Sequence, residues 1–292
     1  MLNVKASAPV RIDLAGGWSD IEYFTKKHTG TVVNIAINKR ANAELNIDEN
    51  GKINVNYNCE VPIGTGLGTS SAINVALLSC INHSTFSPET SAELAHRFEA
   101  LLGGPVGRQD QWSSSFGGAL HLKFEKEHVK ILPFNPKNST IKWLEEHLIL
   151  AHTKIPHISG EVHTPIWERF NKGDSIIINS IKKLEKLADE MAKALIEDNR
   201  ENIIEILNEV TKTTDLLSPS INQPVRLFCN DLMNENLALA WKIMGAGGGG
   251  VVGILSNKNK IVETKERCEK EGWTVIDWEM DTKGVILEKV KK

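Results

Sequence analysis

The sequence predicts an α+β protein made of two domains, residues 1–140 and residues 141–292. Both halves of the chain contain short β-like runs as well as helical runs. The 292 residues suffice for one large or two ordinary domains, and a composition that is 41% apolar and 24% charged is typical of a globular protein with a filled core. Prolines and polar residues mark a soft boundary at 135–145.

The N-terminal half begins with β-like sequence. Four runs rich in β-branched residues are separated by Gly, Asn and Asp, which predicts an antiparallel or mixed sheet. These runs are residues 4–10, 31–37, 43–47 and 53–57. From Ser70 onward, apolar residues recur at helical spacing and predict a helix. A second helix is expected over 88–102, followed by a strand over 119–124.

The C-terminal half alternates in the same way. A strand is expected over 147–153, and a long helical region over 174–214 is interrupted near Asp198 and Asn199. One more helix follows Pro224, and a glycine run then precedes an apolar strand. The remaining expected elements are the strand at 251–255, a helix at 262–271, and strands at 273–278 and 284–290.

Charge and composition exclude several classes of function. The net charge is −3, the pI is near 6.3, and the 34 Lys and Arg residues are dispersed, so we expect no nucleic-acid partner. We expect no membrane partner and a cytoplasmic location, because no leader pattern and no apolar stretch of about 20 residues occurs. The four cysteines lie far apart, which argues against a zinc site or a disulfide framework.

The segment from Pro62 to Ala72 carries the strongest chemical signal. It places Gly64, Gly66 and Gly68, and then three hydroxyl residues, directly before the predicted helix. Glycines let the backbone approach an anion closely, and a helix N-terminus presents N–H groups and a favourable dipole to it. An ordinary turn with a hydroxyl N-cap is the alternative, but three hydroxyls exceed the needs of one cap. The segment therefore predicts a polyphosphate site.

Two well-known phosphate loops do not fit this segment. The P-loop requires a lysine that is absent here, and the Rossmann pattern would need a glycine at Thr69. The segment instead resembles the second motif of the galactokinase, homoserine kinase, mevalonate kinase and phosphomevalonate kinase (GHMP) superfamily. Residues 9–20, PVRIDLAGGWSD, and residues 245–250, GAGGGG, resemble its first and third motifs.

Within that superfamily, the first motif and residues 107–118, GRQDQWSSSFGG, look like the branch of heptose 7-phosphate kinases and fucokinases. The resemblance implies an N-terminal domain like the second domain of ribosomal protein S5 and a ferredoxin-like C-terminal domain. It also implies an active site between the two domains.

The resemblance implies two catalytic residues. Asp110 corresponds to the carboxylate that accepts the proton of the acceptor hydroxyl. Arg11 stands where the family carries Arg or Lys, and a fixed cation there would stabilise charge on the transferred phosphoryl group. The alternatives are a helix-capping or salt-bridged Asp110 and an edge-strand Arg11 in a salt bridge.

The resemblance also implies ATP and Mg²⁺ as cofactors. Magnesium prefers oxygen ligands, which by register are Ser70 and Glu99, with Thr69 and Ser71 as neighbouring choices. Glu99 could instead belong to a solvated helix face. The residues expected to bind ATP are Pro62, Gly64, Gly66, Leu67, Gly68, Thr69, Ser70, Ser71 and Ala72.

A sugar site is expected around the first motif. Carboxylates accept hydrogen bonds from sugar hydroxyls, and an aromatic ring often lies nearby. The residues expected to bind substrate are Asp13, Gly17, Trp18, Asp20, Gly247 and Gly248. Residues 153–163 depart from the heptose kinases, which tend to read Thr-Gly-x-x-Arg there, since Lys154 replaces the glycine and His157 the arginine. His152, His157 and His163 lack metal-ligand spacing and are expected at the surface or facing the substrate.

These observations predict a kinase that transfers the γ-phosphate of ATP to a sugar hydroxyl, the anomeric one by resemblance. The substrate would be a heptose 7-phosphate or a fucose-like sugar, and the protein a monomer or a homo-oligomer. The alternatives are a mevalonate-type kinase and a catalytically silent sugar sensor. A nicotinamide-dependent dehydrogenase is a further alternative that an absence of NAD binding would remove.

Overall fold

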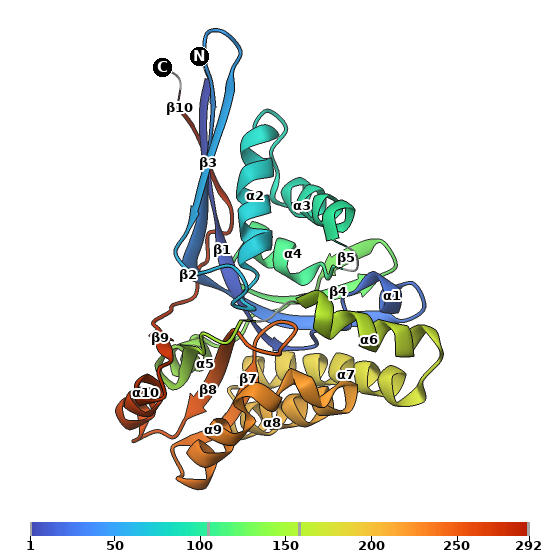
Figure 1. Cartoon of the computed structure of the whole chain (residues 1–292), viewed down its shortest axis with the longest axis vertical. Coiled ribbons are helices and arrows are strands. Elements are labelled where there is room, and N and C mark those ends of the chain that lie inside the picture. Colours follow the sequence, from blue (N-terminus) through green and yellow to red (C-terminus); the bar gives the residue numbers. More distant parts are fainter. Residues whose placement is uncertain (1, 104–105, 157–158, 291–292) are drawn as a thin grey trace.

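A computed structural model describes residues 2–103, 106–156 and 159–290, which form two antiparallel sheets with helices packed around them (Figure 1). The six-stranded first sheet has the order β10-β1-β2-β4-β5, and β3 also pairs with β2. Its strands are β1 (Leu2–Ala15), β2 (Thr29–Ile47), β3 (Ile53–Cys59), β4 (Ala119–Glu125), β5 (His128–Ile131) and β10 (Ile286–Val290).

The first two strands are longer than expected. The runs at 31–37 and 43–47 form one strand, β2, which pairs with β1 on both sides of a register shift between Pro9 and Val10. Proline has no N–H to donate to the ladder, so a bulge at this position is physically reasonable. The strands expected at 53–57 and 119–124 are confirmed as β3 and β4.

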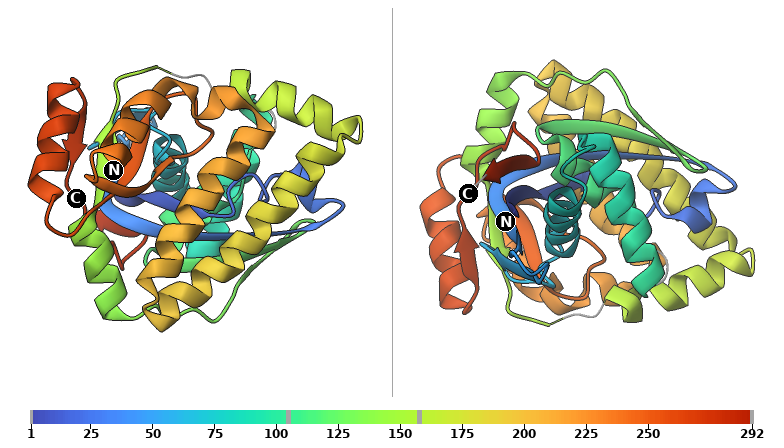
Figure 2. Two further views of the ribbon diagram at one scale, coloured as in Figure 1. Left: turned by 90° about the horizontal axis from the view of Figure 1, so that it is seen from below. Right: turned by 90° about the horizontal axis from the view of Figure 1, so that it is seen from above.

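Helices cover one face of this sheet. They are α1 (Glu22–Thr25), α2 (Thr69–Ile81), α3 (Pro88–Gly103) and α4 (Gln109–Phe116), and the sheet curves around α2 (Figure 2). Buried Ala72, Val75 and Cys80 on α2 join the same apolar core as Val4 and Leu45 on the strands. The helices expected from Ser70 onward and over 88–102 are confirmed as α2 and α3. Helix α4 was not foreseen.

The second sheet has the order β7-β8-β6-β9, with strands β6 (Leu148–His152), β7 (Ala238–Ile243), β8 (Val251–Ser256) and β9 (Thr274–Ile276). The helices of this half are α5 (Asn138–His147), α6 (Ser159–Asn171), α7 (Ser175–Glu197), α8 (Arg200–Leu217), α9 (Gln223–Asn234) and α10 (Ile261–Lys270), with a short 3₁₀ turn at Pro219–Ile221. The expected strands at 147–153 and 251–255 are confirmed, while β7, α5 and α6 were not foreseen.

The interruption expected in the long helical region is confirmed. Asp198 adopts a left-handed conformation with φ 59°, and the Asn199 side chain caps α8 by accepting a hydrogen bond from Asn202 N–H at 3.1 Å. The two helices pack against each other as an antiparallel pair (Figure 2). Within the described ranges, no helix combines the length and apolarity needed to cross a bilayer.

The two halves of the chain are tied together by the C-terminal segment. Strand β10 pairs with β1, and Arg40 on β2 forms an ion pair with Asp281. We propose the division into residues 1–140, with a ribosomal protein S5-like arrangement, and residues 141–292, with a ferredoxin-like one. In that division β10 crosses back from the second part to the first sheet.

Candidate active site

A cleft of about 330 Å³ opens where the two halves of the chain meet. Its walls come from β1 and the loop after it, the segment before α2, the C-terminal end of α3, the start of α4, α6 and the loop after β7. All three sequence motifs contribute to its lining. Residues far apart in the sequence are therefore gathered around one space.

The loop before α2 has the geometry of an anion site. Gly64, Gly66 and Gly68 have φ angles of +80°, +76° and +75°, a left-handed region that favours glycine. Gly68 is the N-cap of α2, and no side chain among the described residues caps this helix. The first N–H groups of a helix lack intrahelical acceptors, so these remain available to phosphate oxygens.

The other residues expected to bind ATP have varied surroundings. Leu67 and Ala72 are buried in the core, and Leu67 accepts a backbone hydrogen bond from Arg11 at 2.9 Å. Thr69 is buried, and its hydroxyl donates to the Pro62 carbonyl at 3.2 Å. Ser70 is exposed at the cleft. The buried residues therefore shape the loop, and the glycines and Ser70 face the cleft.

The third motif packs directly on this loop. A Cβ at Gly66 would lie 2.3 Å from the Met244 carbonyl oxygen, and Val251 N–H donates to the Thr65 carbonyl at 2.7 Å. Of this motif, Gly245 and Ala246 line the cleft. Gly247 and Gly248 are placed against Ile221, whose carbonyl accepts a hydrogen bond from Gly248 N–H at 2.8 Å.

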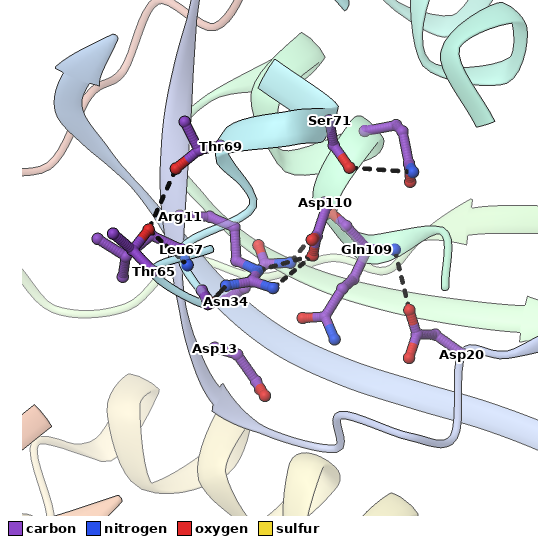
Figure 3. A network of polar contacts seen from close by, with 12 residues as sticks. Arg11, Asp13, Asp20, Asn34, Thr65, Leu67, Thr69, Ser71, Gln109 and Asp110 are labelled. Atoms are coloured by element: carbon purple, nitrogen blue, oxygen red, sulfur yellow. Dashed lines mark hydrogen bonds and ion pairs between the residues drawn. The ribbon is translucent and has the colours of Figure 1, made fainter. Parts of the chain in front are cut away.

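Arg11 and Asp110 meet in the cleft (Figure 3). The Arg11 guanidinium is 3% exposed, and its Nε and Nη2 lie 2.8 and 2.6 Å from Asp110 Oδ1. Its Nη1 donates to the Gly66 carbonyl at 2.7 Å. The other carboxylate oxygen, Oδ2, lies against Gly68, where an added Cβ would be 3.1 Å away. One oxygen of Asp110 is thus held firmly, while the other faces the glycine loop before α2.

Asp20 lies beneath the start of α4 (Figure 3). It is 2% exposed and accepts a hydrogen bond from Gln109 N–H at 3.1 Å, so it acts on the N-terminus of the helix that carries Asp110. Burial, reinforced by the charges of Asp110 and Asp13, raises the pKa of Asp20 to about 7. A Cβ at Gly107 would lie 2.1 Å from its carboxylate, so glycine is required there.

Asp13 contacts a residue that sequence reasoning missed. Lys242 on β7 places its Nζ 3.0 Å from Asp13 Oδ2, and both side chains are buried. A Cβ at Gly17 would lie 2.4 Å from the same oxygen. Trp18 has a φ of +79°, unusual for a bulky residue, and its ring contacts the His163 ring at a tilt of 32° with centroids 4.4 Å apart. His163 lines the cleft, whereas His157 lies outside the described residues.

Glu99 faces the cleft from α3. Its carboxylate accepts hydrogen bonds from Ser71 Oγ at 3.0 Å, Asn74 Nδ2 at 3.1 Å and Gln111 Nε2 at 3.1 Å. Burial raises the pKa of Glu99 to about 7. The hydroxyl in contact with Glu99 is that of Ser71, while Ser70 lies exposed on the cleft wall.

The site suits a magnesium ion brought by a nucleotide. The described part of the chain holds no group of three or more His, Cys, Asp or Glu arranged as a metal site. Magnesium usually takes one or two carboxylates and completes its shell with phosphate oxygens and water. Glu99 and Ser70 are oxygen donors beside the phosphate loop, so these residues fit such an ion.

Comparison with known proteins identifies the family. Residues 30–118 match the model of the GHMP kinases N terminal domain. Glucuronokinase 1 of Arabidopsis thaliana is 29% identical over 237 residues, which cover 76% of this chain and 62% of that protein. Residues 30–118 therefore belong to the GHMP kinase superfamily. The chain spans less than two thirds of the length of this plant GHMP kinase.

Two further GHMP kinases match along nearly the whole chain. The D-glycero-alpha-D-manno-heptose 7-phosphate kinase of Campylobacter jejuni is 24% identical over 98% of both chains. The crystal structure of a D-glycero-D-manno-heptose 1-phosphate kinase from Bacteriodes thetaiotaomicron superposes with a TM-score of 0.79 at 18% identity. It covers 99% of this chain and 100% of that one. The GHMP kinase fold therefore extends across both sheets, whereas the likeness to a glucuronokinase was not foreseen from the sequence.

Proposed function

We propose that this chain is a kinase that uses ATP and Mg²⁺ to phosphorylate a hydroxyl group of a sugar. The observation that carries the proposal is the position of Asp110, with Oδ1 bound by Arg11 and Oδ2 against Gly68 at the uncapped start of α2. A base and a phosphate site thus lie side by side, which is the arrangement that in-line phosphoryl transfer requires.

In the proposed reaction, a sugar hydroxyl lies between Asp110 and the glycine loop. Asp110 accepts the hydroxyl proton at Oδ2 as the oxygen attacks the γ-phosphorus, while the bond from the γ-phosphorus to the β–γ bridging oxygen breaks and ADP leaves. Arg11 keeps the carboxylate oriented and places a fixed positive charge beside the transferred group. The expected acceptor is the anomeric hydroxyl, as the resemblance to heptose kinases and fucokinases implies.

Magnesium would neutralise phosphate charge when bound with ATP. We propose that Ser70 and Glu99 are its protein ligands and that the Ser71 hydroxyl orients the Glu99 carboxylate. The network of Ser71, Asn74 and Gln111 around Glu99 supports this role, since a solvated surface carboxylate would not need three side-chain donors.

The charges of the cleft favour a neutral sugar. The described residues that line the cleft include four acids, which are Asp13, Asp20, Glu99 and Asp110. They include one Lys or Arg, which is Arg11. The Arg11 donors are already directed to Asp110 and Gly66. Among the described lining residues, a substrate with its own phosphate or carboxylate would meet four acids and no further Lys or Arg, which is costly. This argument favours a fucose-like sugar over a heptose 7-phosphate, a glucuronate or mevalonate.

A coupled assay of ADP release over a panel of substrates tests the proposal. We expect turnover with a neutral sugar, at a kcat/KM at least about tenfold above that for sugar phosphates, uronic acids or mevalonate. Excess chelator should abolish it. Full activity in chelator would contradict the magnesium proposal, and activity on mevalonate alone would favour the mevalonate-type alternative. Binding of sugar and ATP without any ADP release would favour the silent sensor.

A further inference from the structure

We propose that Lys242 is a positioning residue of the sugar site, which holds the Asp13 carboxylate so that its Oδ1 accepts a hydrogen bond from a substrate hydroxyl. The inference rests on the proposed function, because it assumes that a polyhydroxylated substrate occupies the cleft. It adds a residue from the second sheet, outside the three sequence motifs, to a site built mainly by the first.

The geometry of the pair is specific. Lys242 on β7 and Asp13 on β1 are 229 positions apart, and their Nζ and Oδ2 atoms lie 3.0 Å from each other. The side chains are 7% and 4% exposed. Nζ also donates to the Ile243 carbonyl at 3.2 Å, which fixes the direction of the ammonium group. The lysine on the second sheet therefore restrains one oxygen of an aspartate on the first sheet.

The other oxygen of Asp13 is the functional one. Among the described residues, Asp13 Oδ1 is buried and has no hydrogen-bond partner, although Asp13 lines the cleft. An unpaired buried acceptor is unfavourable, so its presence in a cleft calls for a donor from outside the protein. A sugar hydroxyl is such a donor. Gly17 permits this placement, since a Cβ there would lie 2.4 Å from Asp13 Oδ2.

Lys242 also compensates the negative charge of Asp13. Asp13 and Asp110 both act electrostatically on buried Asp20, so three carboxylates share this wall of the cleft. A buried carboxylate without a counter-charge is strongly disfavoured. Lys242 supplies that counter-charge from β7 in the second sheet. A small cavity next to the pair is lined by Asp13, Lys242 and Gly245, so the lysine also connects the sugar site with the third glycine motif.

The competing interpretation is that the pair only joins the two sheets. It predicts that loss of Lys242 lowers stability without distinguishing one substrate from the other. Arg40 offers a matched control, because it forms a partly buried ion pair with Asp281 that ties β2 to the C-terminal segment, and it does not line the cleft. Arg40→Met should lower the melting temperature and leave the KM values of sugar and ATP within about twofold.

The test compares steady-state kinetics of Lys242→Met, Asp13→Asn and the double variant with the whole wild-type chain. For Lys242→Met we expect the sugar KM to rise at least about tenfold, as for loss of one hydrogen bond to a charged group, while the ATP KM changes less than about twofold. The double variant should have the sugar KM of Asp13→Asn alone, because Lys242 acts through Asp13.

Each kinetic result for these variants either supports or overturns the positioning role of Lys242. The double variant removes both charges, so it stays informative even if Lys242→Met alone fails to fold. Equal rises in the two KM values, or fully additive effects of the two substitutions, would overturn the role of Lys242 while leaving the kinase proposal intact. A wild-type protein without activity on any sugar would overturn the proposed function, and this inference with it.

Discussion

At the scale of single residues, the carboxylates of the cleft have distinct surroundings. Asp110 is held by Arg11, Asp13 by Lys242, and Asp20 by a backbone N–H of α4. The sequence predicted these aspartates through their motifs, but it gave no information on their partners. The structure adds that Asp20 supports the helix that carries Asp110, besides any contact with a sugar.

Asp20→Asn tests this support through pH. Because burial raises the folded-state pKa of Asp20 to about 7 from 3.8, the folded protein binds more protons than the unfolded chain between these values. The stabilising contribution of Asp20 is therefore present below pH 3.8 and is lost as the pH rises through 7. Relative to wild type, Asp20→Asn should gain melting temperature between pH 5 and pH 8, while its amide oxygen still accepts from Gln109.

Asp174→Asn is the control for that experiment. Asp174 caps α7, and hydrogen bonds from Arg169 and two backbone N–H groups lower its pKa below 3.8. Its ionisation is therefore complete throughout pH 5 to 8, and the difference in melting temperature from wild type should stay constant. A constant difference for Asp20→Asn as well would contradict a buried, partly protonated Asp20.

At the scale of elements, two glycine loops form the proposed phosphate site together. Gly66 approaches the Met244 carbonyl and Gly245, and Gly250 approaches the Thr65 carbonyl. Both loops were predicted from the sequence, with the second closing on the first, and the structure confirms that they are in contact. Gly68→Val, the obvious test of the first loop, would also disturb Asp110, because a Cβ at Gly68 would lie 3.1 Å from that carboxylate. A substitution at Gly66 tests the loop without placing a Cβ against the Asp110 carboxylate.

Gly66→Ala should weaken ATP binding. The added Cβ would lie 2.3 Å from the Met244 carbonyl oxygen, so the two loops must move apart. Gly51→Ala is the matched control, since Gly51 has a φ of +77°, close to the +76° of Gly66, and open space around it. Both variants should lose about 1–2 kcal/mol to backbone strain. Only Gly66→Ala should raise the ATP KM, by about tenfold or more. If Gly66→Ala and Gly51→Ala bound ATP with equal affinity, the contact between the loops would have no role in ATP binding.

Local sequence predicted the elements with strong periodicity and missed those without it. The interruption of the long helical region was visible because Asp198 and Asn199 favour left-handed and capping conformations. Helix α4 was missed because its sequence, QDQWSSSF, is short and polar, yet five of its central side chains are buried by the surrounding fold. Tertiary packing, which no local pattern records, stabilises that helix.

At the scale of the whole molecule, the site depends on contacts between distant segments. The pair of Lys242 and Asp13 spans 229 positions, and β10 at the C-terminus pairs with β1 at the N-terminus. Periodicity and composition describe neighbours along the chain, so neither contact could be predicted from them. The family resemblance supplied the roles of Arg11 and Asp110, and the structure supplied the hydrogen bonds that orient them.

The central claim is that Asp110 removes the proton from a sugar hydroxyl during phosphoryl transfer. The most direct test measures the turnover of Asp110→Asn with its best neutral sugar, together with calorimetric binding of ATP and of the sugar. Loss of the base should lower kcat and kcat/KM together by about 10²-fold or more, because the missing interaction belongs to the transition state, while both ligands still bind. A variant that binds both ligands and turns over at a near-native rate would contradict this account.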